Sequence, residues 1–302
     1  MKQIVILSGK GGTGKTSVTA AFAHLASQES HIQTVLVDAD VDAANLELIL
    51  APQVVEAHDF VGGQVAVIDQ TVCAGCGSCT SVCRFDAVID EGSVFAIDPV
   101  ACEGCAACMT QCPNETIHMQ PQVAGRWFRS NSRYGPLLHA ALRPAAENSG
   151  KLVALIREQA SLLAQAEARP LVIVDGPPGV GCPVISACSG ADVAVIVAEP
   201  TAAGVHDMGR VLETTQHFGV PSLVCINKAD IHPRGAAEIE TYCQARELPL
   251  IGHLPFDTAV VEAMVQAQPI TAYQPESPIS RAVREAWQQI LVEVDRNGDV
   301  GT

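Results

Sequence analysis

The feature that most constrains the fold is a glycine-rich segment, GKGGTGKT, at residues 9–16. It follows an apolar run at residues 4–7 and precedes an Ala-rich segment of helical character. This is the G-x-x-x-x-G-K-[ST] pattern in the setting it requires, between a strand and a helix. Its glycines let backbone N–H groups and the helix N-terminus surround phosphate oxygens. The segment predicts a phosphate-binding loop, with a simple helix-capping turn as the alternative.

Within this loop, the motif predicts different roles for different side chains. Lys15 is expected to reach the β- and γ-phosphates, and the Thr16 hydroxyl is expected to ligate Mg²⁺. The other expected nucleotide contacts come from the rest of the loop and the residue after it: Gly9, Lys10, Gly11, Gly12, Thr13, Gly14 and Ser17.

The remainder of the chain alternates apolar runs with helical patterns. Further strands are predicted at 34–37, 171–174, 193–198 and 222–226, and a helix at 151–167. Such alternation is typical of βαβ units and a mostly parallel sheet. A last helix is predicted at 279–294, with apolar residues at 3–4 spacing and balanced charges. We expect it to pack on the core rather than to anchor the chain in a membrane.

Cysteines interrupt this pattern in the middle of the chain. Eight of the twelve lie between residues 73 and 112, in a segment that repeats itself at an offset of 29 residues. The N-terminus lacks the features of a signal peptide, so a cytoplasmic location is expected. Cysteines in an unexported chain indicate metal binding rather than disulfides.

Both halves of the repeat are C-x₂-C-x₂-C-x₃-C runs, the pattern of bacterial two-cluster ferredoxins, in which the fourth cysteine ligates the other cluster. We therefore predict two [4Fe–4S] clusters, and a zinc site is the weaker alternative. The first cluster is assigned to Cys73, Cys76, Cys79 and Cys112, and the second to Cys102, Cys105, Cys108 and Cys83. Arg84 stands where such a run usually has Pro after its last cysteine.

These patterns predict three stretches: 1–60 and 122–302 form one α/β P-loop ATPase domain, and 61–121 is an inserted α+β ferredoxin-like module. The chain carries 33 acidic against 18 basic residues, for a net charge of −15. An acidic surface repels phosphate backbones and anionic lipid, so neither nucleic acid nor direct membrane insertion is expected. The module is itself acidic, and we expect it to dock on a protein redox partner.

The additional Lys10 makes the loop a deviant form of the motif. In this respect the sequence resembles the class of P-loop ATPases that contains MinD, Mrp and the nitrogenase iron protein. The resemblance implies ATP hydrolysis with Mg²⁺ and an ATP-dependent homodimer, or a heterodimer with a paralogous ATPase. Lys10 would reach the nucleotide of the partner subunit, although it could also be an ordinary exposed lysine.

The same resemblance implies roles for four residues that follow predicted strands. Asp40 would orient the attacking water and Asp38 would support the metal shell, although either could simply cap a helix. Asp175, at the start of DGPPG, would hold Mg²⁺, and Asn227 would contact adenine. Lys10, Lys15 and Asp40 are thus the expected catalytic residues. Cys182 lies at the spacing of a subunit-bridging cluster ligand in the nitrogenase iron protein, without an identifiable second ligand.

Three functions are compatible with these features. The favoured interpretation is a nucleotide-gated electron-transfer protein or redox-regulated ATPase. The first alternative is an iron–sulfur carrier or assembly ATPase, although the C-terminal CxxC common in such carriers is absent. The second is a MinD-like spatial regulator whose clusters sense redox state.

Overall fold

The computed structural model describes residues 1–29, 32–144, 146, 148–201 and 203–296, which divide into two compact units. The first unit contains residues 1–58, 127–141 and 149 onward, and the second contains residues 59–126 and 142–148. Two long strands, β3 (Gln53–Ile68) and β6 (Ile117–Ser132), have residues in both units. The chain therefore leaves the first unit along one strand and returns along another.

A nine-stranded sheet organises the first unit, in the order β11-β10-β9-β1-β8-β2-β7-β6-β3. The pairs from β11 to β7 are parallel, which matches the alternation of strands and helices in the sequence. Its remaining strands are β1 (Lys2–Ser8), β2 (Thr34–Asp38), β7 (Gly135–Leu142), β8 (Leu171–Pro178), β9 (Val193–Ala198), β10 (Ser222–Asn227) and β11 (Leu250–Leu254). The four strands predicted beyond the first lie within β2, β8, β9 and β10.

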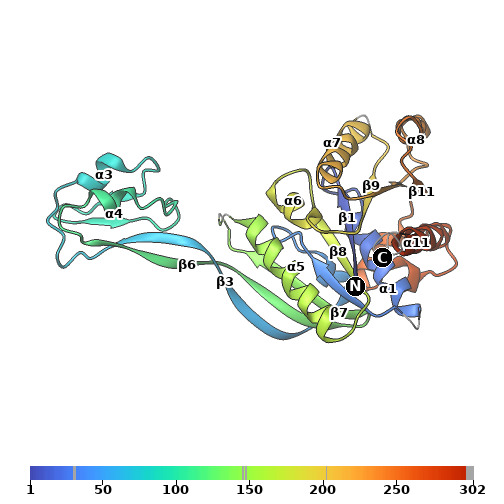
Figure 1. The fold of residues 1–302 in the computed structure, drawn as a ribbon, viewed down its shortest axis with the longest axis horizontal. Helices are drawn as coiled ribbons and strands as arrows, with labels where there is room; N and C mark the ends of the chain where they lie inside the picture. The colour runs from blue at the N-terminus through green and yellow to red at the C-terminus, as the bar shows by residue number, and fades with distance from the viewer. Residues whose placement is uncertain (30–31, 145, 147, 202, 297–302) are drawn as a thin grey trace. The chain divides into compact units, whose positions relative to one another are not determined.

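Helices cover both faces of this sheet (Figure 1). One layer consists of α1 (Lys15–Gln28) and the helices grouped around it: α2 (Leu46–Leu50), α9 (Ala259–Val265), α10 (Ile270–Tyr273) and α11 (Pro278–Arg296). The other layer consists of α5 (Ser149–Ala166), α6 (Cys182–Cys188), α7 (Gly204–His217) and α8 (Pro233–Ala245). Strands covered on both faces must be apolar throughout, and β1, β2 and β9 are buried along almost their whole length.

The last helix, α11, contains the predicted segment 279–294. Trp287 packs on Phe22 of α1 with ring centroids 5.5 Å apart. The five apolar residues at 3–4 spacing are all buried: Ile279, Val283, Trp287, Ile290 and Val294. The prediction of a helix packed on the core is therefore confirmed. In the part of the chain that the structure describes, no helix combines the length and apolar character needed to cross a membrane.

The second unit shows the internal repeat in its backbone. Its helices α3 (Ser78–Val82) and α4 (Ala107–Gln111) begin 29 residues apart and pack against each other. Gly75 and Gly104 have nearly the same positive φ, +64° and +65°, and at both positions a Cβ atom would collide with a backbone oxygen. A two-stranded antiparallel sheet of β4 (Val88–Asp90) and β5 (Phe95–Ile97) lies between the two halves in sequence.

Candidate functional site

The phosphate loop joins β1 to α1 at the carboxyl end of the parallel strands, where ligands bind in open α/β sheets. Gly14 precedes α1 with φ +89°, a left-handed conformation that disfavours side chains. A Cβ atom at Gly14 would also lie 2.2 Å from the amide nitrogen of Asn227. Glycine is thus required here both by the backbone and by its neighbour.

Lys15 of this loop is paired with the aspartate of β8. Its Nζ lies 3.0 Å from Asp175 Oδ1, and the two side chains are only 6% and 1% exposed. Thr19 donates a second hydrogen bond to the same oxygen, at 2.9 Å. The other carboxylate oxygen, Oδ2, is buried without a hydrogen-bond partner among the described residues. A buried carboxylate oxygen of this kind is costly unless a cation or donor reaches it, so Asp175 fits a hydrated Mg²⁺ ion.

Asp38 lies directly beside Asp175, because the two residues are in register on the adjacent strands β2 and β8. Asp38 accepts hydrogen bonds from the backbone amides of Asp40, Asn45 and Leu46. Burial, followed by the charge of Asp175, raises the pKa of Asp38 to about 8 against the opposing effects of the Leu46 and Asp40 amides and of Lys15. Burial and the neighbouring carboxylate of Asp175 thus both disfavour a negative charge on Asp38.

Asp40 is half-buried after the same strand. Burial raises its pKa, Lys15 opposes the rise and Asp175 adds to it, so Asp40 lies within the electrostatic range of both groups. Lys15, Asp38, Asp40 and Asp175 thus lie in one region of the structure. The roles predicted for them in metal binding and catalysis remain predictions. Thr16 is partly exposed at the start of α1.

The additional lysine of the loop bonds within its own chain. Lys10 Nζ lies 2.9 Å from Glu199 Oε2 and donates to Thr201 Oγ1 at 3.3 Å. Lys228 Nζ lies 2.7 Å from the other Glu199 oxygen and also donates to the Gly12 carbonyl. Burial opposes the charge of Glu199, but the two lysines outweigh it and lower its pKa.

Sequence reasoning did not assign a role to Glu199 or Lys228. The available signal was their position after strands β9 and β10, at the sheet edge where parallel strands place functional groups.

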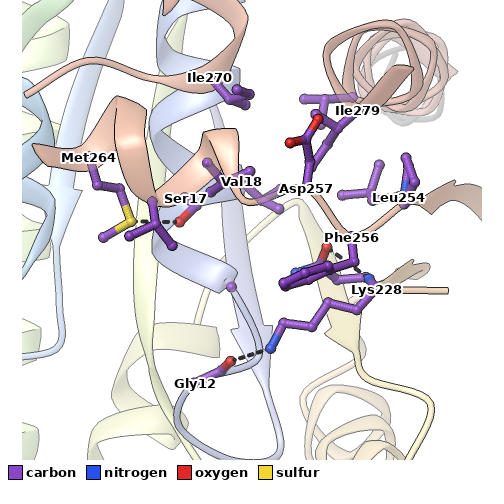
Figure 2. Close-up of a pocket in the computed structure, with 16 residues that line it drawn as sticks. Gly12, Ser17, Val18, Lys228, Leu254, Phe256, Asp257, Met264, Ile270 and Ile279 are labelled. Carbon is purple, nitrogen blue, oxygen red and sulfur yellow. Dashed lines mark hydrogen bonds between the residues drawn. The ribbon is translucent and has the colours of Figure 1, made fainter. Parts of the chain in front are cut away.

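A cavity of about 240 Å³ opens beside the loop (Figure 2). Asn227 lines it and donates from Nδ2 to the Thr13 carbonyl at 2.7 Å. Phe256 and neighbouring residues after β11 form another wall, and the amide of Phe256 is held by Asp230. Figure 2 also shows Ser17 facing the sulfur of Met264. Most of the other lining residues are apolar and come from α9, α10 and α11: Val260, Val261, Met264, Ile270, Ile279 and Val283.

The eight cysteines of the two runs lie in the second unit as free thiols. Among the described residues, no three Cys, His, Asp or Glu side chains stand in an arrangement that could hold a metal ion. Four thiols nevertheless line one small cavity, and they come from both runs: Cys83, Cys102, Cys105 and Cys108. Cys83 and Cys112 occupy equivalent places, immediately after α3 and α4.

Electrostatic effects between the thiols also connect cysteines that were assigned to the same cluster. A hydrogen bond to Ser78 lowers the pKa of Cys76, and the charge of Cys112, from the other run, opposes it. Burial raises the pKa of Cys108, to which Cys102 and Cys105 add. Thiols from the two runs are thus close enough to affect one another.

The fold and the loop define a P-loop nucleotide-binding protein with a mostly parallel α/β sheet. Residues 4–270 match the family described as the CobQ/CobB/MinD/ParA nucleotide binding domain, and the chain belongs to that family. The prediction of an ATPase is confirmed by this membership.

Individual relatives extend over nearly the whole chain. The uncharacterized protein MJ0578 of Methanocaldococcus jannaschii is 34% identical over 288 residues, 95% of this chain and 96% of its own length. The septum site-determining protein MinD of Bacillus subtilis is 26% identical, covering 96% of this chain and 89% of that protein. Among solved structures, the Pyrococcus horikoshii septum site-determining protein MinD complexed with Mg-ADP is 18% identical, with a TM-score of 0.60. That alignment covers 100% of this chain and 98% of the other.

Proposed function

We propose that this chain is an Mg·ATP-hydrolysing iron–sulfur protein in which the nucleotide state controls electron transfer. The observation that carries the iron–sulfur part is the cavity lined by Cys83 from one run and Cys102, Cys105 and Cys108 from the other. This set is the crosswise combination expected of two-cluster ferredoxins. Zinc sites rarely need two such runs, so the donor set favours clusters.

Eight thiolates would hold two [4Fe–4S] clusters. Cys73, Cys76, Cys79 and Cys112 would ligate one, and Cys102, Cys105, Cys108 and Cys83 the other. When bound, such clusters accept and release single electrons. The chain would supply the thiolates. The turns at Gly75 and Gly104 would allow each run to bend tightly around a cluster.

In the nucleotide site, Lys15 would leave Asp175 to bind the β- and γ-phosphates, and Thr16 would ligate Mg²⁺. The buried, unpartnered Asp175 oxygen and the neighbouring Asp38 carboxylate support an Mg²⁺ ion held at this point. Asp40 would orient the attacking water. Hydrolysis then depends on positioning and charge neutralisation more than on covalent chemistry.

The cavity beside the loop would receive the adenine base. Asn227 offers amide groups at its edge and Phe256 an aromatic face. The backbone groups between Gly9 and Gly14, with Ser17, would complete the nucleotide contacts. Lys10 would exchange Glu199 for a phosphate on a partner subunit, which makes an ATP-dependent dimer part of the proposal.

The decisive experiment is an anaerobic redox titration of the purified full chain by EPR, with and without Mg·ATP. We expect the midpoint potential to shift by about 59 mV or more, a tenfold change in equilibrium for one electron. Clusters that are present without any shift would refute gating. They would favour instead the MinD-like alternative, a regulator with redox-sensing clusters, which the similarity to the Bacillus subtilis protein supports.

Iron analysis of variants tests the ligand assignment separately. Cys76→Ser and Cys105→Ser should each lose about half of the bound iron, because each removes one ligand of one [4Fe–4S] cluster. Cys182→Ser is the matched control, since Cys182 is exposed but lies outside both runs. Full iron content in both test variants would refute the assignment, whereas iron loss in the control would point to the subunit-bridging cluster considered above.

A further inference from the structure

A buried histidine on β7 is part of a hydrogen-bond network that the nucleotide site does not account for. His139 is 4% exposed, and its Nδ1 lies 3.0 Å from Glu47 Oε2. Its Nε2 lies 2.9 Å from the hydroxyl of Ser130, which is fully buried on β6. Because an ionised carboxylate can only accept, Nδ1 carries the proton, and Nε2 of the neutral ring accepts from Ser130.

This network adjoins the segment that holds Asp38, predicted for the metal shell, and Asp40, predicted to orient water. His139 is in register with Asp38 on the adjacent strand β2. Asp38 in turn accepts from the amides of Asn45 and Leu46, and Glu47 is the next residue, in the first turn of α2. The stretch from Asp38 to Glu47 is therefore held at one end by Asp38 and at the other by His139.

We propose that the Ser130–His139–Glu47 network positions residues 38–47 for nucleotide turnover and carries the nucleotide state into strand β6. His139 is a positioning residue in this scheme, because it acts through Glu47 and α2. Strand β6 begins at Ile117, five residues after the last cysteine of the second run. The link to the cysteines rests on the proposed function, whereas the positioning part rests on the nucleotide site alone.

The charges around Asp38 would change when nucleotide binds, and the network could transmit that change. Asp175 is paired with Lys15, and both groups act on Asp38: the charge of Asp175 raises the pKa of Asp38, and the charge of Lys15 lowers it. When Lys15 moves to phosphate and a cation approaches Asp175, the electrostatic potential at Asp38 changes. The hydrogen bonds that Asp38 accepts from the Asn45 and Leu46 amides should change in strength as a result. A displacement of α2 would reach Ser130 through two hydrogen bonds.

Glu47 offers the cleanest variants, because its side chain is 41% exposed and its loss should not prevent folding. Glu47→Ala removes the acceptor of His139, whereas Glu47→Gln retains a neutral acceptor and should restore the response. Leu48→Ala, at a 60% exposed position of the same helix, is the matched control. Ser130→Ala interrupts the network on its other side.

The test is amide hydrogen exchange on the full chain, with and without Mg²⁺ and a non-hydrolysable ATP analogue. We expect the analogue to change exchange at residues 127–132 in the wild type, Glu47→Gln and Leu48→Ala. Glu47→Ala and Ser130→Ala should bind the analogue with unchanged affinity but lose that change, and their kcat should fall without a rise in KM. A wild type that does not respond in this strand, or an unaltered response in both test variants, would overturn the proposal. Exchange is measured without reference to cluster potentials, so this failure is distinct from failure of the redox titration.

Discussion

At the scale of single residues, one substitution tests both the proposed contact of Lys15 with phosphate and its ion pair with Asp175. Lys15→Ala should reduce ATP turnover at least about a hundredfold, because a preorganised charge on the transferring phosphate is lost. It should also destabilise the nucleotide-free protein by roughly 3–5 kcal/mol, because buried Asp175 loses its cation. Phosphate release and chemical denaturation measure the two effects. Arg281→Ala, exposed on α11, is the control, and retained turnover in Lys15→Ala would refute the role of the loop.

The pKa of Asp38 makes a second residue-scale prediction, on stability. Its carboxyl titrates at about 8 in the folded chain and near 3.8 when unfolded, so between these values only the folded state holds the proton. The metal-free protein should therefore lose stability as pH rises through this window. Asp38→Asn cannot ionise and should flatten that dependence.

Denaturation at about pH 5 and about pH 8, without Mg²⁺ or nucleotide, measures the slope directly. Asp42→Asn, exposed four residues later, should leave the slope as it is in the wild type. An equal slope in Asp38→Asn and the wild type would contradict the assignment of this dependence to Asp38.

At the scale of elements, α11 contributes to the wall of the cavity beside the phosphate loop. Trp287 is 1% exposed against α1, and Ile279 and Val283 of the same helix line the cavity. Trp287→Ala should cost about 3–5 kcal/mol of unfolding free energy, as large-to-small core substitutions do. Trp287→Phe should cost clearly less, because the indole N–H has no hydrogen-bond partner among the described residues. Equal losses in the two variants, measured by denaturant titration, would show that packing volume does not govern this site.

Elements also show where sequence reasoning was strong. The strands that precede the loop and the predicted aspartates were located from short apolar runs, and α11 from its spacing, because these signals are local. The long strands β3 and β6 were not predicted. Their exposed segments alternate weakly, and Val54 and Val55 of β3 are both more than half exposed. Strand β3 lies at the edge of the sheet and is mostly exposed, so it lacks the continuous apolar run that marks a strand buried on both faces.

At the scale of the whole molecule, the proposed role of Lys10 leads to a prediction about dimer formation. With Mg²⁺ and a non-hydrolysable ATP analogue, the wild type should form a dimer, and Lys10→Ala should stay monomeric because the contact to the partner's phosphate is missing. Light scattering after size exclusion measures the mass, and Arg281→Ala serves again as the control of equal charge. Glu199 keeps its bond to Lys228 in the variant, so the fold should be preserved. A Lys10→Ala dimer would refute the role of this lysine.

The sequence alone determined the parts of this protein whose signal is contiguous: the phosphate loop between a strand and a helix, the duplicated cysteine runs and the mostly parallel α/β class. Only the tertiary structure decided which distant groups meet. The strand order β1-β8-β2-β7 places Lys15 on Asp175, Asp175 beside Asp38, and Asp38 beside His139. The position of Glu199 and the apolar wall of the cavity beside the loop also depend on the tertiary structure. The physical reason is that a motif constrains neighbours along the chain, whereas register and packing bring together residues a hundred or more positions apart.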